Sequence, residues 1–205
     1  MNKGDGIEKR SFEIIAGGCD LSKYDEAQKK VVMRLIHTTG DFDFANMTLF
    51  SDGAIEKAMS ALDRKLPVIT DVNMVKTAIT SKYTDASGIE KFCFITDENV
   101  VEGAKKEGKT RAEYSMEYAA KLYPEAIYAI GNAPTALLKI IELKKEGLIN
   151  PALVIGLPVG FVMAAESKQM LTETDMPYIT NVGTKGGSPC AGAVMNALIK
   201  IKAGI

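Results

Sequence analysis

The sequence predicts an α/β protein: a Rossmann-like three-layer α/β/α sandwich with a parallel sheet of about five strands. From Leu66 onward, short apolar runs alternate with helix-forming segments, and each run ends in a polar or glycine turn. Short strands separated by helices indicate parallel pairing through right-handed connections, with helices covering both faces of the sheet. The predicted strands are Pro67–Thr70, Phe92–Thr96, Ala126–Ile130, Ala152–Ile155 and Tyr178–Val182.

The segment before the first predicted strand is expected to be mainly helical. Apolar or small residues at Tyr24, Ala27, Val31 and Leu35 have the spacing of one helical face. The expected elements are a helix over Ile7–Ala16 stopped by Gly17-Gly18, a helix over Lys23–His37, an irregular stretch over Phe42–Leu49, and a helix over Ala54–Arg64 capped by Ser51-Asp52-Gly53. Thr80–Glu90 and Gly108–Arg111 are expected to be exposed loops.

Length and composition limit the possible functions. The 205 residues, of which 46% are hydrophobic, fit a single domain over 1–205. The 25 basic residues balance 26 acidic ones, so no overall charge favours nucleic acid or a membrane surface. Without a bilayer-spanning run or a signal peptide, a soluble cytoplasmic protein is expected. Cys19, Cys93 and Cys190 lack paired ligand spacing, so free thiols and no metal site are predicted.

Polar residues collect where the predicted strands end, and ligands bind at this edge of open parallel sheets. These residues are Asp71 and Asn73 after the first strand, Asp97 after the second, Gly131-Asn132 after the third, and the turns Gly156–Gly160 and Gly183–Ser188 after the last two. The sequence therefore predicts a cleft along this edge. The glycine spacing matches neither a dinucleotide fingerprint nor a P-loop, and this weighs against a nucleotide enzyme.

His37 is the single histidine of the chain, and no other unperturbed side chain changes charge near neutral pH. On a helical wheel it falls beside Arg34, off the apolar stripe, and a Thr-Thr-Gly-Asp turn follows. A lone histidine is more often a satisfied core or surface residue, so the plain alternative is that it has no chemical role. The neighbouring arginine and the turn favour a site.

The residues around this histidine, Arg34-Leu35-Ile36-His37-Thr38-Thr39-Gly40-Asp41-Phe42-Asp43-Phe44, resemble the histidine motif of the precorrin-8X methylmutase family. The resemblance continues in order along nearly the whole chain. It includes Ser11-Phe12, Asp71–Val75, Thr110-Arg111, Ile130–Leu137, Gly156–Val162, Ala165–Lys168 and Gly186–Ser188. Each segment alone is a weak signal, but together they form a specific signature.

The resemblance implies an isomerase of corrin (cobalamin) biosynthesis. Such an enzyme moves a methyl group between adjacent ring C carbons of precorrin-8X or cobalt-precorrin-8, giving hydrogenobyrinate or cobyrinate. The family's catalytic histidine matches His37, the expected proton donor or acceptor, and the family is homodimeric with sites near the subunit interface. No cofactor is expected, because a sigmatropic shift within one molecule needs neither a redox group nor a covalent nucleophile.

The acetate and propionate arms of such a substrate call for cations, hydroxyls and N–H groups around the cleft. Ser11 and Arg34 match family positions associated with substrate binding. The other expected substrate-binding residues are Thr38, Arg111, Asn132, Thr135, Lys168, Lys185 and Ser188. Thr110 is the expected cap of the helix that presents Arg111 for bidentate contact with a carboxylate.

Three of these segments have plain structural alternatives. Gly131–Thr135 either caps a helix or turns its N–H groups toward a ligand. Gly183–Pro189 is either a simple connection or an anion nest, and it carries Lys185 alone where relatives commonly have two basic residues. Glu166–Lys168 lies inside a predicted helix, where a charged run is ordinarily a solvated face.

Two other classes of function remain open. A non-catalytic corrinoid or tetrapyrrole carrier would use the same cleft and bind the product without turnover. A thiol-dependent α/β hydrolase would use Cys190, because a nearby helix start can lower the pKa of a thiol. A small packed residue is the simpler interpretation of Cys190, since the chain has no second histidine to serve it.

Overall fold

The computed structural model describes residues 3–204, so residues 1–2 and 205 of the expected domain lie outside the described part. Its strands are β1 (Thr48–Phe50), β2 (Val68–Thr70), β3 (Lys91–Phe92), β4 (Ile127–Ile130), β5 (Leu153–Gly156) and β6 (Tyr178–Asn181). They form one sheet in the order β1-β6-β5-β4-β2-β3. All neighbouring pairs are parallel except β1 with β6. The prediction of an α/β sandwich is confirmed, with an additional antiparallel edge strand.

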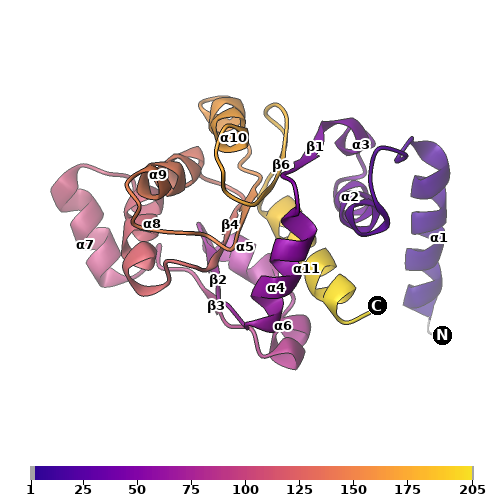
Figure 1. Ribbon diagram of the computed structural model, residues 1–205, viewed down its shortest axis with the longest axis horizontal. Helices are drawn as coiled ribbons and strands as arrows, with labels where there is room; N and C mark the ends of the chain where they lie inside the picture. The colour runs from indigo at the N-terminus through magenta and orange to yellow at the C-terminus, as the bar shows by residue number, and fades with distance from the viewer. Residues whose placement is uncertain (1–2, 205) are drawn as a thin grey trace.

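Helices cover both faces of this sheet (Figure 1). They are α1 (Lys3–Gly18), α2 (Glu26–Thr39), α3 (Phe44–Met47), α4 (Ala54–Asp63), α5 (Asn73–Ala78), α6 (Ser81–Ser87), α7 (Glu98–Glu107), α8 (Arg111–Leu122), α9 (Pro134–Lys145), α10 (Ala164–Thr172) and α11 (Ser188–Lys202). One layer contains α2, α4, α5 and α11, and the other contains α8, α9 and α10. At the two ends of the molecule, α1 packs against α2 and α7 against α8 (Figure 1). No helix within residues 3–204 is long and apolar enough to cross a bilayer.

Successive residues of β4 enter the two hydrophobic cores alternately. Ile127 and Ala129 pack in the core with α2 and α11, whereas Tyr128 and Ile130 pack in the core with α8 and α9. All four side chains are fully buried. Because both faces of the strand are covered, its sequence is apolar without interruption. Each large side chain contributes about 1.5–3 kcal/mol through its burial.

Two edge strands differ from the sequence prediction. The segment 42–49, expected to be irregular, contains α3 and the start of β1, whose partner β6 lies far along the chain. The strand expected over Phe92–Thr96 is shorter, since β3 ends at Phe92. The rings of Phe92 and Phe94 stack on Tyr123, with centroids 5.0 and 6.3 Å away. Aromatic packing therefore replaces strand pairing beyond the end of β3.

The N-terminal helices also have boundaries that the sequence did not predict. The helix α1 begins at Lys3, before the expected Ile7, and ends at Gly18, within the predicted glycine stop. The helix α2 begins at Glu26, three residues later than expected, because Asp25 caps it. One carboxylate oxygen of Asp25 accepts the N–H groups of Ala27 and Gln28, each at 2.8 Å. This capping box sets the start of the helix.

Two further local predictions differ from the structure, the first entirely and the second only in how the helix is capped. Thr80–Glu90 contains the helix α6, which buries Thr84 and ends at the left-handed Gly88. The helix α4 begins after Gly53, and no side-chain hydrogen bond caps it. The hydroxyl of Ser51 instead accepts the Tyr178 N–H at 2.9 Å, which joins this turn to β6.

Candidate active site

The last turn of α2 carries the histidine. Leu35 and Ile36 are buried and hold α2 against the core, so the next residue, His37, is exposed at the end of the helix. Gly40 has φ 67° and closes the helix through a 2.8 Å hydrogen bond from its N–H to the Ile36 carbonyl. The ring of Phe12 on α1 stacks on the imidazole, with centroids 5.2 Å apart and an interplanar angle of 19°. The imidazole is thus exposed to solvent, and the Phe12 ring packs against one of its faces.

Arg34 lies one turn before this histidine and is already ion-paired. Its NH1 atom is 2.7 Å from the Glu8 carboxylate of α1, and its guanidinium lies 4.7 Å from the Phe12 ring centroid. The hydrogen bond from Arg34 lowers the pKa of Glu8. Thr38 is exposed beside His37. The structure therefore brings three of the sequence-predicted residues together at one end of α2.

Ser11 lies next to Phe12 on the facing helix α1. Its hydroxyl donates to the Ile7 carbonyl at 3.0 Å, within the same helix. That proton is used locally, so the Ser11 oxygen retains only its acceptor lone pairs for a further hydrogen bond. The helix α1 therefore places the Phe12 ring against the end of α2, and Ser11 is the residue before it.

The last loop, Gly183–Ser188, is fastened to the turn that follows the histidine. The Lys185 ammonium is 2.6 Å from a carboxylate oxygen of Asp41 and 2.6 Å from one of Asp43. These hydrogen bonds raise the pKa of Lys185, and Lys185 in turn lowers the pKa of Asp41. The cation expected in an anion nest is thus matched by two carboxylates, and the loop is held beside His37.

Lys168 supports the same loop from inside the protein. The prediction of a solvated face was wrong at this position, because Lys168 is only 1% exposed, whereas Glu166 is exposed. The Lys168 ammonium donates to the Lys185 carbonyl at 2.7 Å and to the Asn181 side-chain oxygen at 3.2 Å. Burial lowers the pKa of Lys168 to about 8. Side-chain length explains the error, since Lys168 reaches from α10 beneath a loop distant in sequence.

The helix-start N–H groups expected to face a ligand are occupied by the protein itself. The buried Asp71 carboxylate accepts the N–H groups of Gly131, Asn132 and Ala133 at 3.1, 2.8 and 2.7 Å. Burial raises the pKa of Asp71, and these donors oppose the shift by favouring its ionised form. Within Gly131–Thr135 the N-cap residue is Ala133, whose own side chain makes no capping hydrogen bond.

A second group of predicted residues lies at the starts of α8 and α9. The Thr110 and Thr135 hydroxyls are 3.1 Å apart, and Thr110 caps α8 by accepting the Glu113 N–H at 3.1 Å. Arg111 and Asn132 are exposed nearby in sequence. The expected cap at Thr110 is confirmed, and the hydroxyl pair joins two helix starts that the sequence did not connect.

Close backbone contacts join the strand ends to the last loop. A Cβ on Gly131 would lie 2.8 Å from the Cα of Ser188, so glycine is required where the end of β4 meets the start of α11. A Cβ on Gly186 would lie 2.4 Å from the Leu157 carbonyl, which accepts the Gly187 N–H at 2.8 Å. Ser188 itself is buried in this junction.

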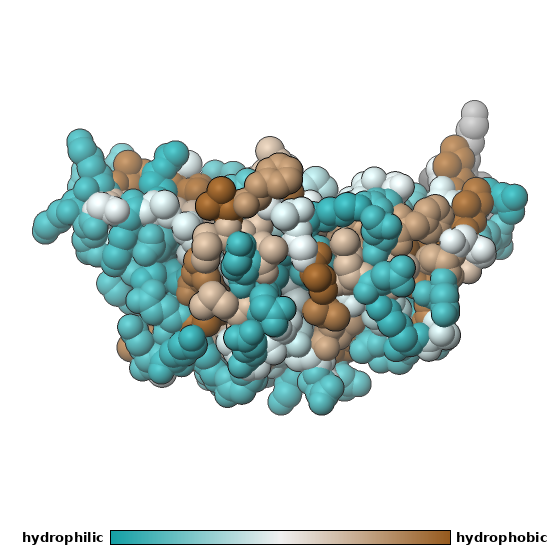
Figure 2. Space-filling model, turned by 90° about the horizontal axis from the view of Figure 1, so that it is seen from above, coloured by the Kyte–Doolittle hydropathy of each residue, from teal (hydrophilic) through white to brown (hydrophobic). Residues whose placement is uncertain are grey.

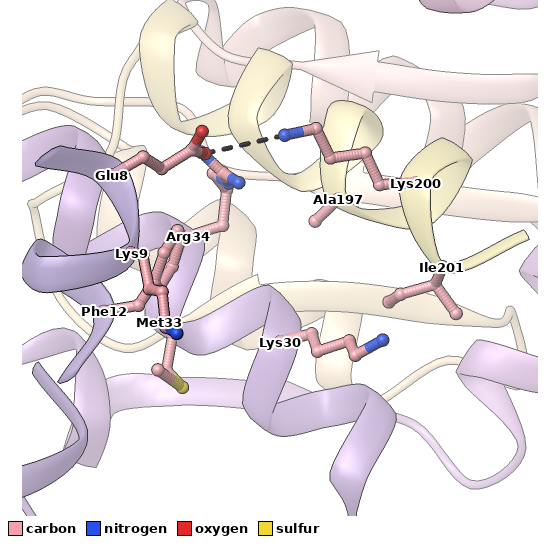
Figure 3. Close-up of a pocket in the computed structure, with 9 residues that line it drawn as sticks. All are labelled: Glu8, Lys9, Phe12, Lys30, Met33, Arg34, Ala197, Lys200 and Ile201. Carbon is pink, nitrogen blue, oxygen red and sulfur yellow. Dashed lines mark ion pairs between the residues drawn. The ribbon is translucent and has the colours of Figure 1, made fainter. Parts of the chain in front are cut away.

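Four charged residues of this region were not recognised from the sequence: Glu8, Asp41, Asp43 and Lys200. Asp41 and Asp43 pair with Lys185, and Glu8 joins Arg34 to Lys200 on α11 (Figure 3). The Gly-Asp-Phe-Asp motif signalled a turn but not a partner for its carboxylates. No sequence signal connects Glu8 with Lys200, because they lie at opposite ends of the chain.

The described residues also bear on metal and thiol chemistry. Between residues 3 and 204, no group of three or more His, Cys, Asp or Glu side chains converges to hold a metal ion. Cys190 is buried in α11, and its burial raises the pKa of the thiol to about 11. A helix start does not activate this thiol, so a hydrolase based on it is disfavoured.

Fold and site together define a class: an α/β protein with one exposed histidine flanked by cations and hydroxyls suited to an anionic ligand. A profile of the precorrin-8X methylmutase family matches residues 6–201. The chain belongs to this family. The cobalt-precorrin-8 methylmutase of Leptospira interrogans is 40% identical, over 97% of this chain and 94% of that protein. The cobalt-precorrin-8 methylmutase of Priestia megaterium is 43% identical, over 94% of this chain and 85% of that protein. A precorrin-8X methyl mutase structure from Thermus thermophilus has 35% identity and a TM-score of 0.90, covering 98% of this chain and 97% of that one.

Proposed function

We propose that the protein is a corrin-pathway isomerase that moves a methyl group between adjacent ring C carbons of cobalt-precorrin-8 or precorrin-8X. The products are cobyrinate and hydrogenobyrinate, respectively. The family match over residues 6–201 carries this proposal. The names of the Leptospira and Priestia relatives support cobalt-precorrin-8 as the preferred substrate.

His37 is the proposed proton donor and acceptor. Its imidazole gives a proton to the macrocycle, the bond from the methyl group to its first carbon breaks as the bond to the adjacent carbon forms, and the proton returns. No electron is gained or lost, so the reaction balances without a redox partner. Exposure of His37 beside Arg34 and Thr38 supports this role. A positioned general acid typically contributes ~10²–10⁴-fold to the rate.

The acid arms of the substrate are proposed to bind in three places. Arg34, Thr38 and Ser11 meet them near His37. The other proposed binding residues are Arg111, Asn132 and Thr135 at the starts of α8 and α9, and Lys168, Lys185 and Ser188 at the last loop. Because Lys168 and Ser188 are buried, they act chiefly by fixing the backbone of that loop.

The functional unit is proposed to be a homodimer in the cytoplasm. Ile7 and Ile14 on α1 are 61% and 55% exposed, and hydrophobic side chains gather at the N-terminal end of the molecule (Figure 2). A second copy that covers this helix would remove them from water. Light scattering at assay concentration is expected to give twice the monomer mass. A monomer under these conditions would contradict the dimer.

Direct conversion tests the proposed activity. The purified protein is mixed separately with cobalt-precorrin-8 and precorrin-8X, and the visible spectrum is followed for the product chromophore. The expected result is conversion, faster with the cobalt form. A non-catalytic carrier would bind cobyrinate and leave the substrate spectrum unchanged, so binding without conversion would establish the carrier in place of the isomerase.

A further inference from the structure

Two cations from different helices converge on one carboxylate. Arg34 of α2 lies 2.7 Å from Oε1 of Glu8, and Lys200 of α11 lies 3.5 Å from the same oxygen (Figure 3). The side chains of both cations are 19% exposed, and that of Glu8 is 39% exposed. One carboxylate therefore serves two partly buried positive charges, and it comes from the peripheral helix α1.

Aromatic rings hold the two cations in place. The Arg34 guanidinium lies 4.7 Å from the ring centroid of Phe12, and the Lys200 ammonium lies 5.3 Å from that of Tyr83. Tyr83 belongs to α6, so the position of Lys200 does not depend on α1 alone. Cation–π contacts of this kind orient a cation without neutralising it. The pair thus retains its affinity for a carboxylate.

Cavities lie on both sides of this cluster. One, of about 410 Å³, is lined by apolar side chains including Met33 and Ile201. The other, of about 330 Å³, includes Thr38 and Asn196. Glu8, Arg34 and Lys200 line both cavities. Thr38, the residue after His37, lines the second cavity, whereas His37 lines neither of the two.

We propose that Arg34 and Lys200 form a carboxylate-binding subsite for one acid arm of the corrinoid, and that Glu8 occupies it until the ligand arrives. This inference rests on the proposed function and adds Lys200 and Glu8 to the site. Exchanging one carboxylate for another keeps the two partly buried cations paired, which avoids the cost of leaving a partly desolvated charge without a partner. Glu8 is the most exposed of the three side chains, so it can turn to water when displaced.

The two new residues have opposite expected effects on ligand affinity. Cobyrinate is titrated by absorbance against the wild-type protein, Lys200→Gln, Glu8→Gln and the double variant. Lys200→Gln is expected to weaken binding about tenfold or more, because a charged hydrogen-bond donor is lost. Glu8→Gln is expected to tighten binding roughly threefold, because it removes an internal competitor. The loss from Lys200→Gln should persist in the Glu8→Gln background.

Two control variants test whether the changes in cobyrinate affinity come only from the altered net charge of the protein. Lys202→Gln alters the same helix at a residue paired with Asp63, and Glu13→Gln alters α1 at a residue paired with Arg10. Neither residue lines the two cavities, so both variants should bind cobyrinate as the wild type does. Circular dichroism establishes that each variant is folded.

The outcomes distinguish this subsite from the proposed activity. Weaker binding in Glu8→Gln, or loss of the Lys200→Gln effect in the double variant, would mean that Lys200 only anchors Glu8 and would overturn the subsite. Unchanged affinity in folded Lys200→Gln would do the same. Conversion of cobalt-precorrin-8 by the wild type is measured in the same preparation. Absence of conversion overturns the proposed activity, whereas conversion with unchanged cobyrinate affinity in Lys200→Gln overturns the subsite alone.

Discussion

The ring of Phe12 on α1 lies almost parallel to the imidazole of His37 on α2, at a centroid distance of 5.2 Å. The same phenyl ring lies under the guanidinium of Arg34. One aromatic side chain therefore positions both the proposed acid and a proposed carboxylate-binding cation. Aromatic stacking of this kind contributes about 0.5–1.5 kcal/mol beyond the burial of area. The peripheral helix α1 is thus connected directly to the chemistry of the site.

Replacing the histidine tests the proton transfer. His37→Ala is expected to bind substrate but to lower the single-turnover rate by about 10²–10⁴-fold, because a positioned acid is lost while the carboxylate contacts remain. Stopped-flow spectra at saturating cobalt-precorrin-8 measure this rate, and a cobyrinate titration checks binding. A parental rate in the variant would leave His37 as a packing residue.

Replacing Arg34 should weaken substrate binding and leave the chemical step largely intact. Arg34→Ala is expected to weaken substrate binding by about 2–5 kcal/mol, because the acid arm loses a charged partner in a partly desolvated site. The shift in bound substrate should proceed nearly normally. The control is Arg64→Ala, an exposed arginine paired with Glu125. If Arg34→Ala retains full affinity, this residue does not bind the acid arm.

The buried Lys168 should make stability depend on pH in the alkaline range. Its folded pKa of about 8 lies below the ordinary value of 10.5, so the unfolded chain holds more protons between these values. Relative to Lys168→Met, the wild type should gain stability from pH 8 to 10.5, by an amount of order 3 kcal/mol. Urea unfolding at both limits measures this gain.

Exposed Lys145 offers the control for this measurement. Lys145→Met should parallel the wild type across the same pH range, because Lys145 is exposed and its replacement removes no buried charge. Parallel curves for the wild type and Lys168→Met would contradict a perturbed, buried Lys168.

Thiol chemistry should be dispensable for turnover. The buried Cys190 has a pKa near 11, so almost none of it is thiolate at neutral pH. Cys190→Ala, alone or combined with Cys19→Ala and Cys93→Ala, is expected to keep most of the single-turnover rate, and iodoacetamide should not inactivate the wild type at pH 7. Loss of chemistry in folded Cys190→Ala would revive a thiol mechanism.

The carboxylate of Asp71 should matter for stability. Asp71→Ala leaves three N–H groups at Gly131, Asn132 and Ala133 without their acceptor, at an expected cost of about 3 kcal/mol or more. Asp97→Ala is the matched control, since Asp97 caps α7 by accepting one N–H, from Asn99, and should cost only about 1 kcal/mol. If urea unfolding shows the same loss of stability in Asp71→Ala and Asp97→Ala, the three hydrogen bonds of Asp71 do not contribute as proposed.

The sequence by itself determined the α/β class and four of the strands to within a residue or so. Strands buried on both faces are apolar without interruption, as in Ile127–Ile130, and this signal is local. The order of motifs along the chain also identified the family and the single histidine. These features lie within short segments, so no knowledge of distant partners was needed.

Tertiary structure alone decided which polar groups are available to a ligand. The N–H groups of the turn before α9 are taken by Asp71, about sixty residues earlier, and Lys185 is paired with Asp41 across the fold. Lys168 is buried because it reaches beneath a loop from another part of the chain, and Glu8 meets Lys200 only when the two ends come together. Hydrogen bonds and ion pairs depend on distance in space, and a linear pattern does not contain that distance.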